Sequence, residues 1–235
     1  MHSSEEIWKG LVLRQKEYRL GALQASPQCF ASSYDREVAF EHDVWDTRLR
    51  NPLAETLVAV RPGDKSGRLA DQAEVILYQP WLGTIVLTGP MEGHNSVDPL
   101  VKGNSVVASA VDSPNETMQD ATAKGEDSVP HYQLNAIYVS PSDRGLGIGK
   151  LLIDAAIERV VSKEQDAQIA RITLIVDYYN HAARRLYERC GFQVIRRYFF
   201  DDPRLTKHDE DPPEQTEAAV MERIMELQAA IDKVY

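Results

Sequence analysis

Three alternating glycines between a predicted strand and a predicted helix limit the fold of this chain more than any other feature. Residues 144–150 read RGLGIGK, with LNAIYV (134–139) before them and LLIDAAIERV (151–160) after them. The apolar, β-branched run predicts a strand, and the apolar residues at helical spacing predict a helix. Glycine permits positive φ angles and close approach of the backbone to a neighbour. The sequence therefore predicts a strand–loop–helix unit whose loop comes close to something, and a phosphate is the first candidate.

The spacing of the glycines excludes two common phosphate-binding loops. A P-loop requires Gly-x-x-x-x-Gly-Lys-Ser/Thr, but Arg144 stands five positions before Gly149, and Leu151 follows Lys150. The dinucleotide-binding fingerprint requires Gly-x-Gly-x-x-Gly, but its third glycine would fall on Lys150 or Leu152. The remaining pattern, Arg-x-x-Gly-x-Gly at the start of a helix, favours an anion because the first helical amides have no partner within the helix. A tight glycine turn without a ligand is the alternative.

A second segment, NHAARRLYERCGF (180–192), reads as a short helix with functional residues on one side. Asn180 is of a residue type typical of helix N-caps, and Gly191 is typical of the position that ends a helix. At about 100° per residue, Asn180 and Tyr187 lie on nearly the same side of the helix, two turns apart, with the small Ala183 near the same face. The helix therefore presents an amide, a gap and a phenol along one line. Taken alone, Tyr187 would be interpreted as a tyrosine at the edge of the core.

Together the two segments resemble the GNAT N-acetyltransferase superfamily. The resemblance covers residues 134–160 and 174–197, about a fifth of the chain. The combination of Arg-x-x-Gly-x-Gly with Asn-x-x-Ala-x-x-Leu-Tyr-x-x-x-Gly-Phe, at this separation, is highly specific. The resemblance implies an α/β (α+β) fold with a mixed, mostly antiparallel sheet of six or seven strands and helices on both faces. It also implies a V-shaped opening of the sheet at the strand that binds the cosubstrate.

The same resemblance implies a role for each residue of the predicted site, with acetyl-CoA as the cosubstrate. Backbone N–H groups of the glycine loop would hold the pyrophosphate, and the backbone of Ile137 and Val139 would pair with the pantetheine arm. The amide of Ile137 would stabilise the oxyanion, Asn180 would contact the CoA arm, and Tyr187 would protonate the departing thiolate. The residues predicted to bind acetyl-CoA are Ile137, Tyr138, Val139, Arg144, Gly145, Leu146, Gly147, Ile148, Gly149, Lys150, Asn180, Ala183 and Tyr187.

The implied reaction moves acetyl directly from the CoA sulfur to an acceptor amine, either a small molecule or a peptide. The amine must be neutral to attack, so a base or a chain of water molecules must take its proton. Gln133 occupies the place where some relatives carry a catalytic glutamate, and glutamine cannot act as a base. His131 and Tyr132 are nearby alternatives, although a polar residue without a catalytic role is the competing interpretation for each. The missing glutamate motivates a second hypothesis, an acyl-CoA-binding or interaction module without turnover.

Composition narrows the partners and the location. The 235 residues include 26 Lys and Arg against 36 Asp and Glu, a net charge of −10, which argues against nucleic-acid binding. No stretch approaches the roughly 20 apolar residues of a membrane span, and the N-terminus lacks the features of a signal peptide. Cys29 and Cys190 form no CxxC pair, which predicts free thiols and a cytoplasmic location. No ligand set accompanies His208 and Asp209, so no metal is predicted. The sequence leaves the oligomeric state open.

We expect one acetyltransferase domain over residues 1–235, with a flexible insertion at 91–130. That stretch contains no aromatic residue and is rich in Ser, Asn, Asp and Gly, which is typical of disorder, although a functional lid is the alternative. An acidic loop over 201–217 could attract a cationic acceptor, and a solvated charged loop is the alternative. If the family's first strand is present, it must come from WKGLVL (8–13), a segment that also fits a helix.

The remaining elements follow from periodicity and from Pro and Gly breaks. The expected helices are 4–25, 34–49 (or a helix beginning near Glu41), 147–164 and 180–190. The expected strands are 57–60, 81–87, 132–139, 171–177 and 192–200. Residues 74–78 either extend the second strand or form one of their own. The segment AAVMERIM (218–225) is either a strand or part of a helix that continues to Val234.

Overall fold

The computed structural model of the protein describes residues 4–61, 72–91, 129–201 and 215–227. The helices are α1 (Ser4–Ala25), α2 (Tyr34–Val38), α3 (His42–Arg50), α4 (Gln72–Tyr78), α5 (Ile148–Lys163) and α6 (His181–Arg189). Two 3₁₀ turns, η1 (Pro27–Cys29) and η4 (Pro141–Asp143), follow α1 and the third strand. The strands are β1 (Ala54–Val60), β2 (Trp81–Met91), β3 (His131–Val139), β4 (Ile169–Asp177), β5 (Gln193–Asp201) and β6 (Gln215–Glu226).

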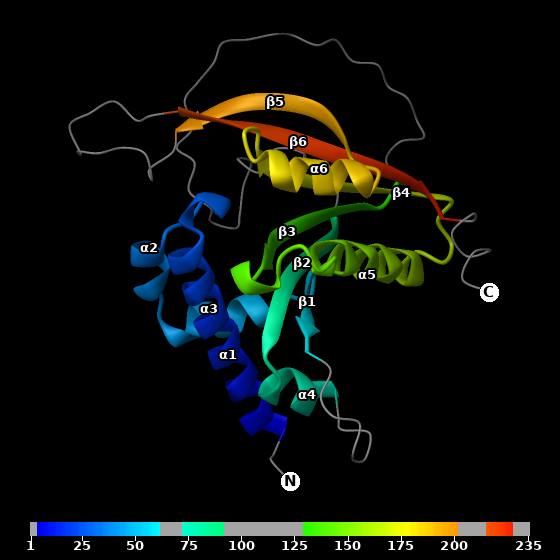
Figure 1. Ribbon diagram of the computed structural model, residues 1–235. Coiled ribbons are helices and arrows are strands. Elements are labelled where there is room, and N and C mark those ends of the chain that lie inside the picture. Colours follow the sequence, from blue (N-terminus) through cyan, green and yellow to red (C-terminus); the bar gives the residue numbers. More distant parts are fainter. Residues whose placement is uncertain (1–3, 62–71, 92–128, 202–214, 228–235) are drawn as a thin grey trace.

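The six strands form one sheet in the order β1-β2-β3-β4-β6-β5, shown in Figure 1. Only β3 and β4 are parallel, and every other neighbouring pair is antiparallel. This arrangement confirms the mixed, mostly antiparallel sheet of six or seven strands that the family resemblance implies.

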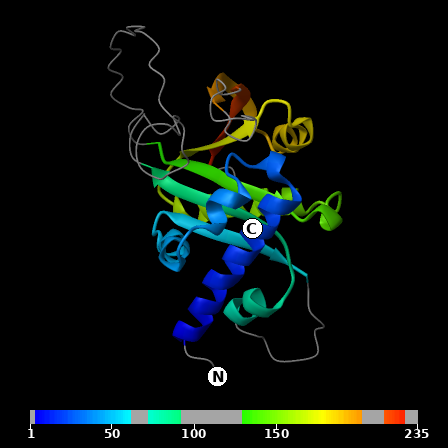
Figure 2. The ribbon, with the colours of Figure 1, turned by 90° about the vertical axis from the view of Figure 1, so that its left-hand side faces the viewer.

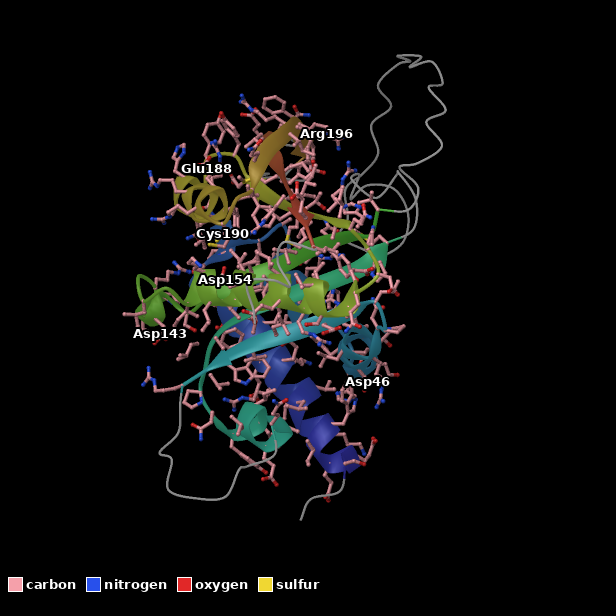
Figure 3. All side chains as sticks on the ribbon, turned by 90° about the vertical axis from the view of Figure 1, so that its right-hand side faces the viewer. Asp46, Asp143, Asp154, Glu188, Cys190 and Arg196 are labelled. Atoms are coloured by element: carbon pink, nitrogen blue, oxygen red, sulfur yellow. The ribbon has the colours of Figure 1, made fainter. Side chains whose placement is uncertain are left out.

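Helices pack on both faces of the sheet. Helix α5 lies against β1, β2 and β3 and buries Ile153, Ala156 and Val160 completely or almost completely. These side chains join a core with Ile85 of β2 and Ile172 of β4. Figure 2 shows α1 in front of the sheet, and Figure 3, from the opposite side, shows α5 in front of it. Burial of these apolar faces supplies the main driving force for folding.

The sheet opens between β3 and β4. The parallel pairing runs only from His131 opposite Arg171 to Leu134 opposite Leu174. Beyond that point β3 stays paired with β2 as far as Val139, while β4 stays paired with β6. The two strands therefore diverge from residue 135 onward, and the expected V-shaped opening is present.

A β-bulge lies where the opening begins. The register of β2 and β3 runs from Thr84 opposite Tyr138 to Val86 opposite Asn135, so β3 has one residue more than β2 in this interval. Ala136 in the bulge has a φ of 48°. An extra residue bends the strand and removes a backbone group from the ladder. The bulge therefore leaves a backbone group of β3 without a partner on β2 at the residues predicted to bind acetyl-CoA.

Two expectations for secondary structure were wrong. The predicted helix over 34–49 is two helices, because the chain turns at Phe40, whose ring packs against Trp45 with a centroid distance of 6.1 Å. The alternative start near Glu41 agrees with α3. Residues 74–78 belong to α4 and not to a strand, because Leu77 packs against Gly10 of α1. Tertiary packing outweighed β propensity there.

The structure decides two alternatives that the sequence left open, one for WKGLVL and one for residues 218–225. WKGLVL lies inside α1, so within the described residues no strand precedes that helix. The segment 218–225 is part of β6, which confirms the strand alternative. Most of the predicted insertion (92–128), most of the acidic loop (202–214) and the last residues (228–235) lie outside the described residues.

Candidate active site

The glycine loop ends in an open helix N-terminus. Gly147 is the N-cap of α5 with a φ of 81°, and no side chain caps the helix there. Gly145 has a φ of 80°, and a Cβ atom built on either glycine meets no atom within 4 Å. The positive φ angles explain the glycines, because other residues rarely adopt them. The first amides of α5, from Ile148 onward, therefore face space that an anion can occupy.

Gly149 is a glycine for a different reason. A Cβ atom at this position would lie 2.8 Å from Cδ2 of Leu186 on α6. The missing side chain lets α5 and α6 pack closely, and it thereby holds the loop and the second motif together.

Side-chain cations near the loop already have partners. The Arg144 guanidinium donates through Nε to the Val139 carbonyl at 3.0 Å and through Nη2 to the Ser26 hydroxyl at 2.9 Å. Lys150 Nζ lies 2.5 Å from Asp154 Oδ2. The positive charge expected from these two residues is thus partly committed, and the backbone amides are the main donors that remain for an anion.

Helix α6 presents its predicted residues in the expected order. Asn180 caps the helix, and its Oδ1 accepts a hydrogen bond from Ala183 N at 3.1 Å. Tyr187, two turns on, is 7% exposed and packs edge-on against Phe192. Burial raises the pKa of the Tyr187 phenol, and nearby Cys29 and Cys190 raise it further. The phenol therefore keeps its proton at neutral pH and can donate it.

The end of α6 lies near the side of α5. Cys190, the C-cap of α6, is buried, and burial raises the pKa of its thiol, with Asp154 of α5 as the next contribution. Figure 3 shows Asp154 and Cys190 on the same side of the molecule. Together with the Gly149–Leu186 contact, this places the two motif helices side by side.

The structure brings almost all of the predicted site residues to one cleft of about 2790 Å³. The predicted residues that line it are Ile137, Tyr138, Val139, Arg144, Gly145, Gly147, Ile148, Gly149, Lys150, Asn180, Ala183 and Tyr187. Leu146 does not line it, and its side chain is 72% exposed. The cleft is large enough for a long cosubstrate together with an acceptor, because sites for single drug-sized ligands enclose about 300–1,000 Å³.

One family matches part of the chain. The model of the acetyltransferase (GNAT) family matches residues 92–192. This part of the chain is therefore similar to that family. A putative [ribosomal protein bS18]-alanine N-acetyltransferase of Bacillus subtilis is 36% identical over 72 residues, which cover 30% of this chain and 45% of that protein. The alignment thus spans less than half of the relative's length.

Two solved acetyltransferase structures share the fold of this chain. The spermidine N-acetyltransferase from Vibrio cholerae, in complex with CoA and spermine, has a TM-score of 0.51 at 12% identity, over 91% of this chain and 92% of that one. A GNAT-family acetyltransferase from Streptococcus pneumoniae has a TM-score of 0.50 at 15% identity, over 90% and 95% of the two chains. At such identities the likeness shows the fold alone.

The two residues considered as bases, His131 and Tyr132, lie apart from the cleft. His131 is buried at the closed end of the V, where its Nε2 lies 2.9 Å from the Thr173 hydroxyl. Burial, followed by the charge of Arg171, lowers the pKa of His131 to about 4. Tyr132 is fully buried and donates to Glu164 Oε1 at 2.5 Å. Neither lines the cleft, whereas Gln133 does.

Sequence reasoning missed the wall of the cleft that lies opposite the two motif helices. Residues of η1, α2 and α3 line it, including Cys29, Phe30 and Arg48. Phe30 packs against Tyr138 of β3 with a centroid distance of 5.5 Å. No motif marked these residues, because their approach to β3 depends on contacts between distant parts of the chain. The turn at Ser26–Pro27 was visible only as the end of a helix.

Neither a metal-binding group nor a membrane-spanning helix occurs in the described part of the chain. The described part of the chain contains no group of His, Cys, Asp and Glu side chains that could hold a metal ion. His208 and Asp209 lie outside it. None of the described helices has the length and apolar character needed to cross a membrane.

Proposed function

We propose that this protein is an N-acetyltransferase that uses acetyl-CoA and transfers the acetyl group directly to an acceptor amine, a small molecule or a peptide, in the cytoplasm. One observation carries the proposal. The diverging edge of β3, the open N-terminus of α5 and the Tyr187 phenol all line one cleft. Along the CoA molecule, the pyrophosphate needs the α5 amides, the pantetheine arm needs the β3 edge, and the thioester needs the Tyr187 phenol.

Each feature has a chemical role in the proposal. The α5 amides bind the pyrophosphate, where the helix dipole favours negative charge. The part of β3 that has left β4 offers backbone groups to the pantetheine amides. Ile137 lies in the bulged interval that β2 does not match, and its amide donates to the thioester oxygen.

Tyr187 acts as the acid in the proposed reaction. The amine nitrogen attacks the thioester carbon, the C–S bond breaks, and the sulfur leaves with the bonding pair. Tyr187 gives its proton to that thiolate and regains one from solvent. Its raised pKa keeps the phenol protonated until the thiolate forms.

The acceptor's proton has no side-chain base in the proposal. Among the cleft carboxylates, Glu37 is buried and bound by Arg19 at 2.7 Å and by Arg48 at 3.5 Å. Burial by itself raises the pKa of Glu37, but these two arginines lower it overall. A carboxylate with a lowered pKa is a poor base, so we assign the amine's proton to water in the cleft and not to Glu37.

The test is substitution of Tyr187 by Phe. With a panel of amines, polyamines and peptides as acceptors, we expect kcat for CoA release to fall by about 100-fold or more. The Kd of acetyl-CoA should stay within about twofold by calorimetry, because the ring remains. Tyr179→Phe, at an exposed tyrosine beside the same helix, is the matched control and should be unaffected.

Gln133, which lines the cleft at the place where some relatives carry a catalytic glutamate, favours one second candidate, an acyl-CoA-binding module without turnover. Tight binding of acetyl-CoA with no CoA release from any acceptor would support that candidate and contradict the transferase. An unchanged rate in Tyr187→Phe, with a working wild type, would remove Tyr187 from the mechanism.

A further inference from the structure

Arg144 connects the glycine loop to the opposite wall of the cleft. Its backbone belongs to the loop, whereas its guanidinium points to the start of η1, where Nη2 donates to the Ser26 hydroxyl at 2.9 Å. Nε holds the Val139 carbonyl at 3.0 Å, and the guanidinium carbon lies 5.6 Å from the centre of the Tyr138 ring. One side chain therefore contacts the cosubstrate strand and the acceptor wall together.

Ser26 is well placed to transmit this contact. It is 1% exposed, its N–H donates to the Ala22 carbonyl at 3.0 Å, and its carbonyl accepts from Cys29 N at 2.9 Å. Ser26 thus joins the end of α1 to η1. Cys29, the last residue of η1, and Phe30, which comes after it, line the cleft. A shift of Ser26 would move the part of the wall that faces the predicted thioester.

Other contacts also hold this side of the molecule on β3. Tyr138 forms a buried cluster with Phe30 and residues of α1, and its ring centroid lies 5.9 Å from that of Tyr18. The Tyr18 hydroxyl lies 3.0 Å from Oγ of Ser140, the residue after β3. None of these contacts involves a residue of the glycine loop. Among these contacts, Arg144 alone joins a residue of the predicted pyrophosphate loop to the wall.

We propose that Arg144 is a positioning residue that fixes η1 on the cosubstrate strand and thereby couples acetyl-CoA binding to acceptor binding. The coupling to an acceptor rests on the proposed function, whereas the fixing of η1 does not. An anion on the α5 amides restrains the backbone of residues 144–147, and the same restraint reaches Ser26 through the guanidinium. Thermodynamic linkage makes the effect reciprocal, so an acceptor on the wall also tightens acetyl-CoA binding.

The first experiment replaces Arg144 with Met, which keeps an unbranched apolar stem and removes both hydrogen bonds. A bond from a charged donor to a buried hydroxyl is strong enough that its loss should raise the acceptor KM about tenfold. We expect kcat and the Kd of acetyl-CoA to change less than about threefold. Ser26→Ala removes only the Arg144–Ser26 bond. The double variant should be no worse than Arg144→Met, because that bond is already lost in Arg144→Met.

The second readout needs no turnover. It measures hydrogen exchange in the free protein at three amides that are bonded within α1 and η1, those of residue 26, Cys29 and Phe30. Exchange at these amides should be about tenfold faster in Arg144→Met and in Ser26→Ala than in the wild type. Exchange in the β4 segment Ile172–Val176 should match the wild type in both. If η1 responds in this way but no amine is acetylated, the proposed function fails and the positioning role of Arg144 stands.

Arg144→Lys separates positioning from direct phosphate binding. Lysine keeps the charge but lacks the forked donors that reach two acceptors in different directions. A positioning role predicts that Arg144→Lys behaves like Arg144→Met in acceptor KM and in η1 exchange. The proposal is overturned if Arg144→Met instead weakens acetyl-CoA at least tenfold, Lys restores that affinity, and η1 exchange stays at the wild-type rate in both variants.

Discussion

At the scale of single residues, the glycines of the loop differ in what they permit. Gly145 and Gly147 have positive φ angles and open space around them, whereas Gly149 makes room for Leu186. The motif was visible in the sequence because it is local. The purpose of each glycine was not visible in the sequence. It depends on a leucine in another helix and on backbone angles, which residue types alone do not determine.

A substitution series tests this distinction. Gly149→Ala forces the Leu186 side chain or the two helices apart and should destabilise the protein by about 1–2 kcal/mol. Adding Leu186→Ala should recover part of that loss, so the double variant is more stable than the sum of the single effects predicts. Gly147→Ala also costs about 1–2 kcal/mol, through its φ of 81°. Leu186→Ala should not relieve that cost. Thermal unfolding of the six proteins, the wild type included, measures both cycles, and equal coupling in the two would contradict the assignment.

At the scale of elements, the closed end of the V depends on a short parallel pairing. His131 of β3 and Thr173 of β4 are both buried there and joined by a 2.9 Å contact. The strands themselves could be predicted from their β-branched runs. The position of His131 could not, because its closeness in sequence to the cosubstrate strand suggested the active site, whereas the strand carries it to the opposite end of the opening.

This position predicts an acid-sensitive fold. The pKa of His131 falls from 6.5 to about 4 in the folded protein. The folded state therefore binds this proton less readily than the unfolded chain. The resulting stability is complete above about pH 6.5 and is lost as the pH falls toward 4, by up to about 3 kcal/mol.

The variant His131→Gln tests this prediction, because glutamine cannot titrate. Urea unfolding between pH 7 and pH 4 should show a smaller loss of unfolding free energy in the variant than in the wild type. His42→Gln, at an exposed histidine, should keep the wild-type slope, and identical slopes in all three proteins would rule out His131 as the cause.

At the scale of the whole molecule, the two walls of the cleft come from distant parts of the chain. Helices α5 and α6 form one, and η1 with α2 and α3 forms the other (Figures 1 and 2). The bond between Arg144 and Ser26 joins residues 118 positions apart. The wall that carries the two family motifs could be predicted, because each motif is contiguous. The other wall could not, because it exists only once the sheet has brought β3 beneath η1.

The charge of the whole molecule also bears on the proposed cosubstrate. The chain has a net charge of −10, and acetyl-CoA is a polyanion. Lys150 near the loop is neutralised by Asp154, and the Arg144 guanidinium is directed toward Ser26. Attraction therefore comes from backbone amides, whose field acts over a few ångströms, whereas the net charge acts over a Debye length. The net charge therefore repels acetyl-CoA at long range, whereas the backbone amides attract it at short range.

We therefore expect acetyl-CoA to associate faster as salt screens the long-range repulsion. Between about 10 mM and 150 mM salt the Debye length falls from about 30 Å to about 8 Å, and stopped-flow measurements should show a rise in kon of about two- to fivefold. Asp154→Asn and Glu158→Gln remove the same charge from two positions of α5. Both should raise kon at low salt, but only Asp154→Asn should also lower koff, because it releases Lys150 toward the loop. A kon that falls with salt in the wild type would show instead that a local positive field governs the encounter.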